Sequence, residues 1–186
     1  MGHHQPDRRE PARDSARLTW SGDRIDLDGL RPGWGSIWQG GMLDDEGLKA
    51  VEAATEKGLV IVAMNVEARA WDYERLVDHR AKVLAYVYVG IEDSPEGCLP
   101  DDQLIVLVGT LLTVLRRGYH VVDLCAAGIS RSGLLDTCLH MAALDVDWDT
   151  ALTAVRIHRP QTNPNTGFVE QGKRLEAQVR ALGRAA

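Results

Sequence analysis

Cys125 and Arg131 are the two residues of this sequence whose types and spacing could carry out covalent chemistry together. Five residues separate them, an apolar strand-like run over 120–124 precedes them, and a helix-like run over 132–144 follows. A strand that ends in a tight loop and opens a helix offers backbone N–H groups and a helix dipole to an anion. A thiol there ionises more readily than free cysteine, and a guanidinium can hold two oxygens of a tetrahedral oxyanion. The pattern therefore predicts transfer of a phosphoryl group to sulfur.

The loop itself is expected to bind oxyanions such as phosphate, sulfate or vanadate. The residues assigned to this binding are Ala126, Ala127, Gly128, Ile129, Ser130 and Arg131. The other two cysteines are expected to have different roles. Cys138 shares a helical face with apolar residues and is predicted to be a core residue. Cys98 is a candidate resolving thiol for Cys125 under oxidation, with an ordinary surface thiol as the alternative.

The elements that must position these residues alternate along the chain. Strand-like runs cover 59–66, 83–89 and 120–124, and helix-like runs cover 44–57, 73–82, 101–117, 132–144, a stretch from 147 or 149 to Pro160, and a last stretch from 167. Such alternation predicts an α/β fold with a mainly parallel sheet, in which ligands bind at the carboxyl ends of the strands. Cys125 falls at such an end. Asp101 and Asp102 are expected to cap the helix over 101–117.

Several separated motifs resemble one known family. The run DLCAAGISRSGLL resembles the phosphate loop of the cysteine-dependent protein tyrosine phosphatases, specifically their small dual-specificity branch. YVGIED at 88–93 resembles the strand and loop that carry the family's general acid, and RPQTNPNTGF at 159–168 resembles its loop between the last two helices. IWQGGML and LVIVAMNV resemble two of its strand segments. The resemblance spans roughly 37–182 and implies a central, mainly parallel twisted sheet of four to five strands flanked by helices.

The resemblance also implies roles for residues outside the loop. Asp93, thirty-two positions before Cys125, matches the general acid. The competing carboxylates are Glu92, Asp101 and Asp102. Ser132 matches the hydroxyl that stabilises the thiolate when the phosphocysteine intermediate breaks down, and Asn165 matches an asparagine that braces the phosphate loop.

The expected substrate is a phosphorylated protein or peptide. Apart from Arg131 the loop has no basic residue, which favours phosphotyrosine first and phosphoserine or phosphothreonine second. Arg69 and Trp71 lie in a segment that borders the cleft in the family, so the resemblance implies a place at the substrate rim. The alternative for Trp71 is that it covers the edge of the core. The chemistry needs no metal or other cofactor.

Two residues depart from the family pattern. Leu124 stands where the family has histidine, and Asp123 stands where a valine-like residue is usual. Leucine supplies neither a donor nor a charge, and a buried aspartate would oppose a nearby thiolate. We therefore expect the pKa of Cys125 in the upper part of the range of roughly 3.5 to 7.5 that activated thiols show. The sequence reveals no partner for Asp123.

These departures leave alternatives open. A catalytically weak phosphate-binding pseudophosphatase would have the same loop, and a phosphatase for a non-protein substrate is a further possibility. A sulfurtransferase of the rhodanese kind also uses a loop cysteine but needs no acid such as Asp93. Low-molecular-weight phosphatases and arsenate reductases place their cysteine loop near the N-terminus, so the chain order disfavours them.

Length, composition and charge restrict the classes of protein to which this sequence could belong. The 186 residues predict a single catalytic domain over 18–186, preceded by a polar tail over 1–17 that is expected to be disordered. No apolar run approaches the roughly eighteen residues that span a membrane, and no secretory signal is evident. The net charge of −6 does not favour nucleic-acid binding. With only three cysteines, a cytoplasmic location is the default expectation.

Overall fold

The structure is a computed structural model that describes residues 22–25, 31–66 and 82–184. Its strands are β1 (Asp23–Ile25), β2 (Ile37–Gly40), β3 (Leu59–Ala63), β4 (Val83–Tyr88) and β5 (His120–Leu124). Its helices are α1 (Asp45–Ala53), α3 (Asp101–Arg116), α4 (Arg131–Leu144), α5 (Trp148–His158) and α6 (Thr166–Arg184). The predicted tail over 1–17, most of the predicted helix over 73–82, and the candidate rim residues Arg69 and Trp71 lie outside the described residues.

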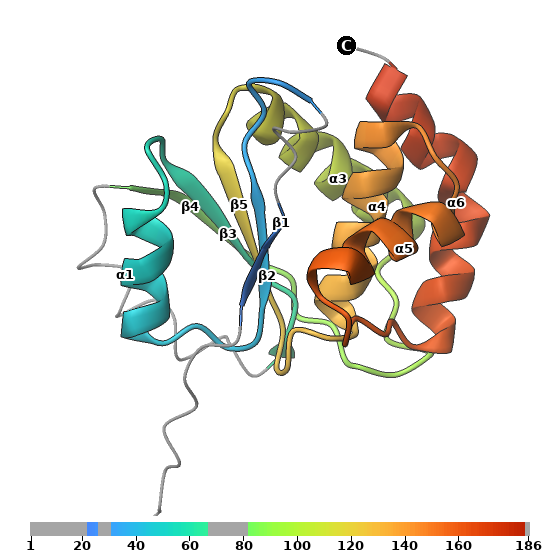
Figure 1. Ribbon diagram of the computed structural model, residues 1–186. Helices are drawn as coiled ribbons and strands as arrows, with labels where there is room; N and C mark the ends of the chain where they lie inside the picture. The colour runs from blue at the N-terminus through green and yellow to red at the C-terminus, as the bar shows by residue number, and fades with distance from the viewer. Residues whose placement is uncertain (1–21, 26–30, 67–81, 185–186) are drawn as a thin grey trace, which may run out of the picture.

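The five strands form one sheet in the order β1-β2-β5-β3-β4 (Figure 1). Only β1 is antiparallel to its neighbour, whereas β2, β5, β3 and β4 are mutually parallel. This arrangement confirms the predicted α/β fold with a mainly parallel sheet. The strand that leads into the phosphate loop is therefore the central one, hydrogen-bonded on both edges.

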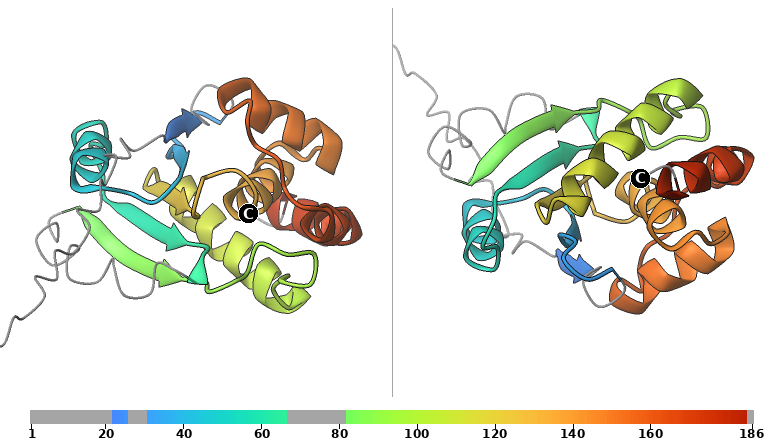
Figure 2. Two further views of the ribbon diagram at one scale, coloured as in Figure 1. Left: turned by 90° about the horizontal axis from the view of Figure 1, so that it is seen from below. Right: turned by 90° about the horizontal axis from the view of Figure 1, so that it is seen from above.

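The helices cover the two faces of the sheet unequally. Among the described helices, α1 packs against one face, and α3, α4, α5 and α6 gather over the other (Figure 2). Side chains alternate along β5, so Val121 and Cys125 face the larger helical layer while Val122 and Leu124 face the cluster under α1. No helix within the described ranges is both long enough and apolar enough to span a bilayer.

Some elements differ from the sequence expectations, and β3, expected to reach Val66, ends at Ala63. α1 ends at Ala53 instead of reaching Lys57. Lys82 Nζ donates to the carbonyls of Glu52 at 2.5 Å and Thr55 at 2.8 Å, which supplies the helix end with donors that no local pattern could reveal. β1 was not predicted at all, because three residues with two charges among them show no strand periodicity.

α5 and α6 approach closely where Gly172 meets the ring of Trp148. A Cβ added at Gly172 would lie 2.0 Å from a ring carbon, whereas one added at Gly109 in α3 would meet only the Leu182 methyl groups, the nearest at 3.6 Å. We expect Gly172→Ala to lower the free energy of unfolding by about 1–3 kcal/mol through overpacking. Gly109→Ala, the control, should leave it unchanged or raise it by up to about 1 kcal/mol. Urea denaturation measures both, and similar effects from the two variants would contradict the close contact.

Candidate active site

The loop between β5 and α4 lies at the carboxyl edge of the parallel strands. Cys125 comes directly after β5, and Arg131 is the first residue of α4. Gly128 at the turn of this loop has a φ of +66°, and a Cβ there would lie 2.3 Å from the carbonyl carbon of Gly40 at the end of β2. Only glycine fits a left-handed position so close to another backbone. The loop is thereby pressed against the neighbouring strand.

The thiol of Cys125 lies where several hydrogen-bond donors converge. Its Sγ accepts the backbone N–H of Gly128 at 3.2 Å and lies 3.3 Å from the Oγ of Ser132. Burial opposes ionisation of the thiol, but hydrogen bonds from Ser132 and from the backbone of Ile129, together with the charge of Arg131, hold its pKa below the usual value. The site therefore favours a thiolate although the side chain is only 2% exposed.

N–H groups that turn toward the thiol leave the loop carbonyls facing outward, and buried carbonyls need donors. Arg159, at the end of α5, supplies two of them: Nε donates to the carbonyl of Gly128 at 2.6 Å and Nη2 to that of Ala127 at 3.2 Å. Its Nη1 donates to Asp23 of β1 at 2.7 Å. This arginine is 1% exposed, so its charge is neutralised inside the protein.

Gln39 and Asn163 complete the support of the loop. Gln39 Nε2 donates to the carbonyl of Gly128 at 3.3 Å, and its Oε1 accepts the hydroxyl of Thr162 at 3.2 Å. The backbone N–H of Asn163 donates to the carbonyl of Ile129 at 3.0 Å. Sequence reasoning missed Gln39 and Arg159. A general rule could have indicated them: the carbonyl groups of an anion-binding loop face away from the anion and need hydrogen-bond donors from neighbouring elements.

Asp93 reaches the phosphate loop from the segment between β4 and α3. Its Oδ1 accepts the hydroxyl of Ser130 at 2.6 Å and the Nδ2 group of Asn165 at 3.0 Å, and its Oδ2 lies 4.0 Å from Nε of Arg131. Arg131 Nη1 also donates to the carbonyl of Ile91 in the same segment, at 3.1 Å. The side chain of Asp93 is 40% exposed. It therefore lies at the rim of the loop, open to solvent on one side.

Asn165 joins three parts of the site. Its backbone N–H donates to Ser130 Oγ at 3.1 Å, its Nδ2 group donates to Asp93, and its Oδ1 accepts the N–H of Phe168 at 3.1 Å. The last contact caps the N-terminus of α6. The structure thus places this residue against the phosphate loop and against the candidate acid.

The competing carboxylate Asp101 forms its hydrogen bonds with residues of α6. It accepts hydrogen bonds from Arg174 at 2.7 Å and from Gln171 at 2.9 Å, and the Arg174 bond is the main reason that its pKa lies below the usual value. The expectation that Asp101 and Asp102 cap α3 is wrong. The capping position is Pro100, which provides no side-chain hydrogen bond, and the two carboxylates lie in the first turn. There they still interact favourably with the helix dipole.

The other two thiols differ from Cys125. Partial burial raises the pKa of Cys98, and complete burial raises that of Cys138 to about 12. Cys138 lies in the core, as predicted. A raised pKa makes a thiol a weaker nucleophile, so Cys125 is the one cysteine whose surroundings activate it.

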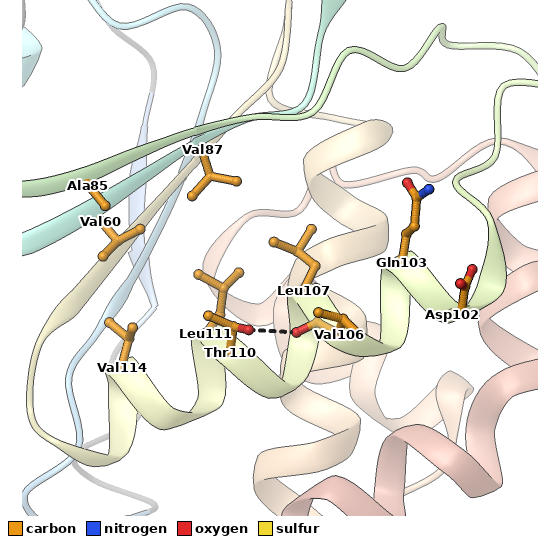
Figure 3. Close-up of a pocket in the computed structure, with 10 residues that line it drawn as sticks. All are labelled: Val60, Ala85, Val87, Asp102, Gln103, Val106, Leu107, Thr110, Leu111 and Val114. Carbon is orange, nitrogen blue, oxygen red and sulfur yellow. Dashed lines mark hydrogen bonds between the residues drawn. The ribbon is translucent and has the colours of Figure 1, made fainter.

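A hollow lies between α3 and strands β3 and β4, away from the phosphate loop (Figure 3). Its apolar lining comes from Val60, Ala85, Val87, Leu107, Leu111 and Val114. None of the predicted site residues lines it, and such a wall does not suit a phosphate group. Within the part of the chain that the structure describes, no three His, Cys, Asp or Glu side chains gather as a metal site requires.

Arg159→Lys should loosen the phosphate loop. Lysine keeps the charge but cannot donate in one plane to Ala127, Gly128 and Asp23. We expect the free energy of unfolding to fall by about 2–4 kcal/mol, as for a broken buried charge network, and tungstate binding to weaken. Urea denaturation and calorimetric titration with tungstate measure the two effects. Arg117→Lys, at an exposed arginine that follows the last residue of α3, is the control and should change stability by less than about 0.5 kcal/mol. Equal behaviour of the two variants would remove Arg159 from the support of the loop.

Comparisons with known proteins agree with this geometry. No protein-family model matches the chain. Dual specificity protein phosphatase 22-B of Danio rerio is 47% identical over 47 residues, a segment that spans 25% of this chain and 26% of that relative. The chain thus matches only about a quarter of that relative's length.

Solved structures resemble the chain over a larger share. A mouse putative dual specificity phosphatase complexed with zinc tungstate matches with a TM-score of 0.64 and 21% identity, over 86% of this chain and 89% of that one. The human tyrosine phosphatase-like serine/threonine/tyrosine-interacting protein matches with a TM-score of 0.63 and 21% identity, over 76% and 91%. The predicted resemblance is confirmed: the chain has the fold that these phosphatase structures share, and a quarter of its sequence is similar to a dual-specificity phosphatase.

Proposed function

We propose that the protein hydrolyses phosphate monoesters on proteins through a phosphocysteine intermediate, with 18–186 as its catalytic domain. The proposal rests on the hydrogen-bond donors that converge on the sulfur atom of Cys125. The N–H of Gly128 and the hydroxyl of Ser132 both contact Cys125 Sγ, and Asp93 lies against the same loop. A lowered thiol pKa beside a carboxylate at the rim supplies a nucleophile and a proton donor at one place.

In the first step the thiolate of Cys125 attacks phosphorus and the bond from phosphorus to the leaving oxygen breaks. Asp93 in its protonated form gives its proton to that oxygen. The transition state carries charge on three equatorial oxygens, which the loop N–H groups and the guanidinium of Arg131 stabilise. Little reorganisation is needed, because Arg159 and Gln39 already hold the loop.

In the second step a water molecule attacks the phosphorus of phosphocysteine and the sulfur–phosphorus bond breaks. Asp93, now a carboxylate, takes a proton from the water. Ser132, whose Oγ lies 3.3 Å from Sγ, donates a hydrogen bond to the departing thiolate. The products are inorganic phosphate and the original thiolate.

The proposed substrates are phosphotyrosine first and phosphoserine or phosphothreonine second. Arg131 is the only basic residue of the loop, so the loop itself offers a single guanidinium to a phosphate group. Inorganic oxyanions should compete for the same place. A cytoplasmic setting suits the proposal, because a reactive thiol needs a reducing compartment to stay free.

A catalytically weak phosphate-binding module is the second candidate, and Asp123 favours it. This aspartate is fully buried close to the thiol, and burial together with the charges of Asp136 and Cys125 raises its pKa, so a thiolate and an ionised Asp123 disfavour each other. A sulfurtransferase fits less well, because the carboxylate of Asp93 hydrogen-bonded to Ser130 has no task in that reaction. Turnover of p-nitrophenyl phosphate, measured with and without vanadate, separates the enzyme from the binding module.

Cys125→Ser should abolish turnover of p-nitrophenyl phosphate while tungstate still binds. A serine hydroxyl stays protonated at neutral pH and is a far weaker nucleophile than a thiolate. Calorimetric titration with tungstate shows that the loop is intact. Cys98→Ser, at a thiol that nothing activates, is the control and should retain full activity. Substantial turnover by purified Cys125→Ser would rule out the covalent mechanism.

Asp93→Asn should slow a phosphate ester with a basic leaving oxygen by about 10²–10⁴-fold and p-nitrophenyl phosphate much less. A proton is required in the transition state only where the leaving oxygen is basic. Asparagine keeps an oxygen for Ser130 and Asn165, so the loop should stay closed. The kcat of phenyl phosphate and of p-nitrophenyl phosphate gives the comparison. Asp101→Asn is the control, and equal losses on the two esters would assign the acid to another residue.

A further inference from the structure

Ser130 stands where α4 begins, and its hydroxyl does not cap that helix. Serine is among the residues most favoured at this position, because an extended backbone lets its oxygen accept an N–H of the first turn. Asp44 and Asp147, at the starts of α1 and α5, are extended and accept such a bond. Ser130 instead has a φ of −101° and a ψ of −68°, and its side chain makes no capping bond. Its hydroxyl, on a residue that is only 8% exposed, therefore serves another purpose.

The hydroxyl of Ser130 is directed at Asp93. The backbone N–H of Asn165 donates to Ser130 Oγ at 3.1 Å, and Oγ lies 2.6 Å from Oδ1 of Asp93. A hydroxyl can donate one hydrogen bond and can accept through two lone pairs. Because a backbone N–H can only donate, the bond from Asn165 occupies a lone pair of Oγ. The hydroxyl proton then points at the carboxyl group.

Asn165 provides a second donor to the same oxygen. Its Oδ1 accepts the backbone N–H of Phe168 at 3.1 Å, which fixes the orientation of the amide and identifies the other atom as nitrogen. That Nδ2 donates to Asp93 Oδ1 at 3.0 Å. The other oxygen of Asp93, Oδ2, lies on the side of Arg131, at 4.0 Å from Nε. The two oxygens of the candidate acid therefore have different surroundings.

This difference determines which oxygen of Asp93 can carry the acidic proton. A protonated carboxyl group has one hydroxyl oxygen, which donates, and one carbonyl oxygen, which only accepts. Oδ1 faces two donors and must be the carbonyl oxygen, so the proton resides on Oδ2. The side chain of Asp93 is 40% exposed, so packing alone does not hold the carboxyl group in this orientation. Its hydrogen bonds with Ser130 and Asn165 hold it.

We propose that Ser130 is a positioning residue for the general acid, and that its hydroxyl holds Oδ1 of Asp93 so that Oδ2 delivers the proton. In the first step the O–H bond at Oδ2 breaks while the leaving oxygen gains the proton. In the second step Oδ2 takes a proton from the attacking water, and Ser130 keeps its own proton throughout. This inference rests on the proposed function, since Asp93 has a proton to deliver only if the protein is a phosphatase.

The test compares kcat/KM of phenyl phosphate with that of p-nitrophenyl phosphate in Ser130→Ala. This ratio refers to the steps from free enzyme to phosphocysteine, in which the proton is delivered. Alanine removes the hydroxyl but keeps the backbone N–H of the loop, so tungstate should bind as it does to the unmodified protein. Ser130→Thr restores a hydroxyl, and Ser94→Ala, at the serine that follows Asp93, is the matched control.

We expect Ser130→Ala to lower kcat/KM of phenyl phosphate by about 10–100-fold and that of p-nitrophenyl phosphate by less than about twofold, because a displaced acid matters only where the leaving oxygen is basic. Ser130→Thr should recover most of the loss, and Ser94→Ala should match the unmodified protein on both esters. In an Asp93→Asn background, Ser130→Ala should change kcat/KM of phenyl phosphate by less than about twofold, since no acid remains to be positioned.

Equal losses on the two esters would show that the hydroxyl serves the loop or the thiol, and would overturn the proposal. A further loss of full size in the Asp93→Asn background would do the same. An active phosphatase whose Ser130→Ala variant loses nothing on phenyl phosphate would keep the proposed function and reject only the role of Ser130. An unmodified protein that binds tungstate but hydrolyses neither ester would refute both the proposed function and this inference.

Discussion

The outward-facing carbonyls of the phosphate loop are the constraint on which the rest of the site depends. Because the N–H groups of this loop turn toward one sulfur, its carbonyl groups must accept hydrogen bonds from elements on the other side of the loop. The donors come from β2 and from the end of α5. Arg159 can serve there only because β1 brings Asp23 to its other side. The short antiparallel strand β1 is thereby connected to the phosphate loop through a buried guanidinium.

The position of Leu124 shows how a departure from the family pattern is accommodated. Its side chain faces the apolar cluster under α1, on the opposite side of the sheet from the thiol. The donors that lower the pKa of Cys125 are instead Ser132, Ile129 and the charge of Arg131. The thiol is therefore activated from the loop and the helix end.

Local sequence patterns predicted those parts of the structure that depend on residues close together in the sequence. The strand over 120–124, the loop and the helix after it follow from hydrophobic periodicity and from the turn at Gly128, so the position of the nucleophile could be predicted. The residues that brace the loop could not, because Gln39 and Arg159 reach it only after distant elements have packed together. Asp123 could be recognised as a buried charge without a partner. That α4 buries a second carboxyl group, Asp136, could not be predicted, because its position in the sequence is that of an ordinary helical residue.

The threefold bonding of Asn165 has a consequence for motion. The candidate acid, the hydroxyl of Ser130 and the first turn of α6 all bond to this one side chain and its backbone. The acid-bearing segment therefore cannot move outward while the end of the helix stays undisturbed. Outward motion of this segment and fraying of the first turn of α6 are coupled, because each breaks a hydrogen bond that Asn165 makes.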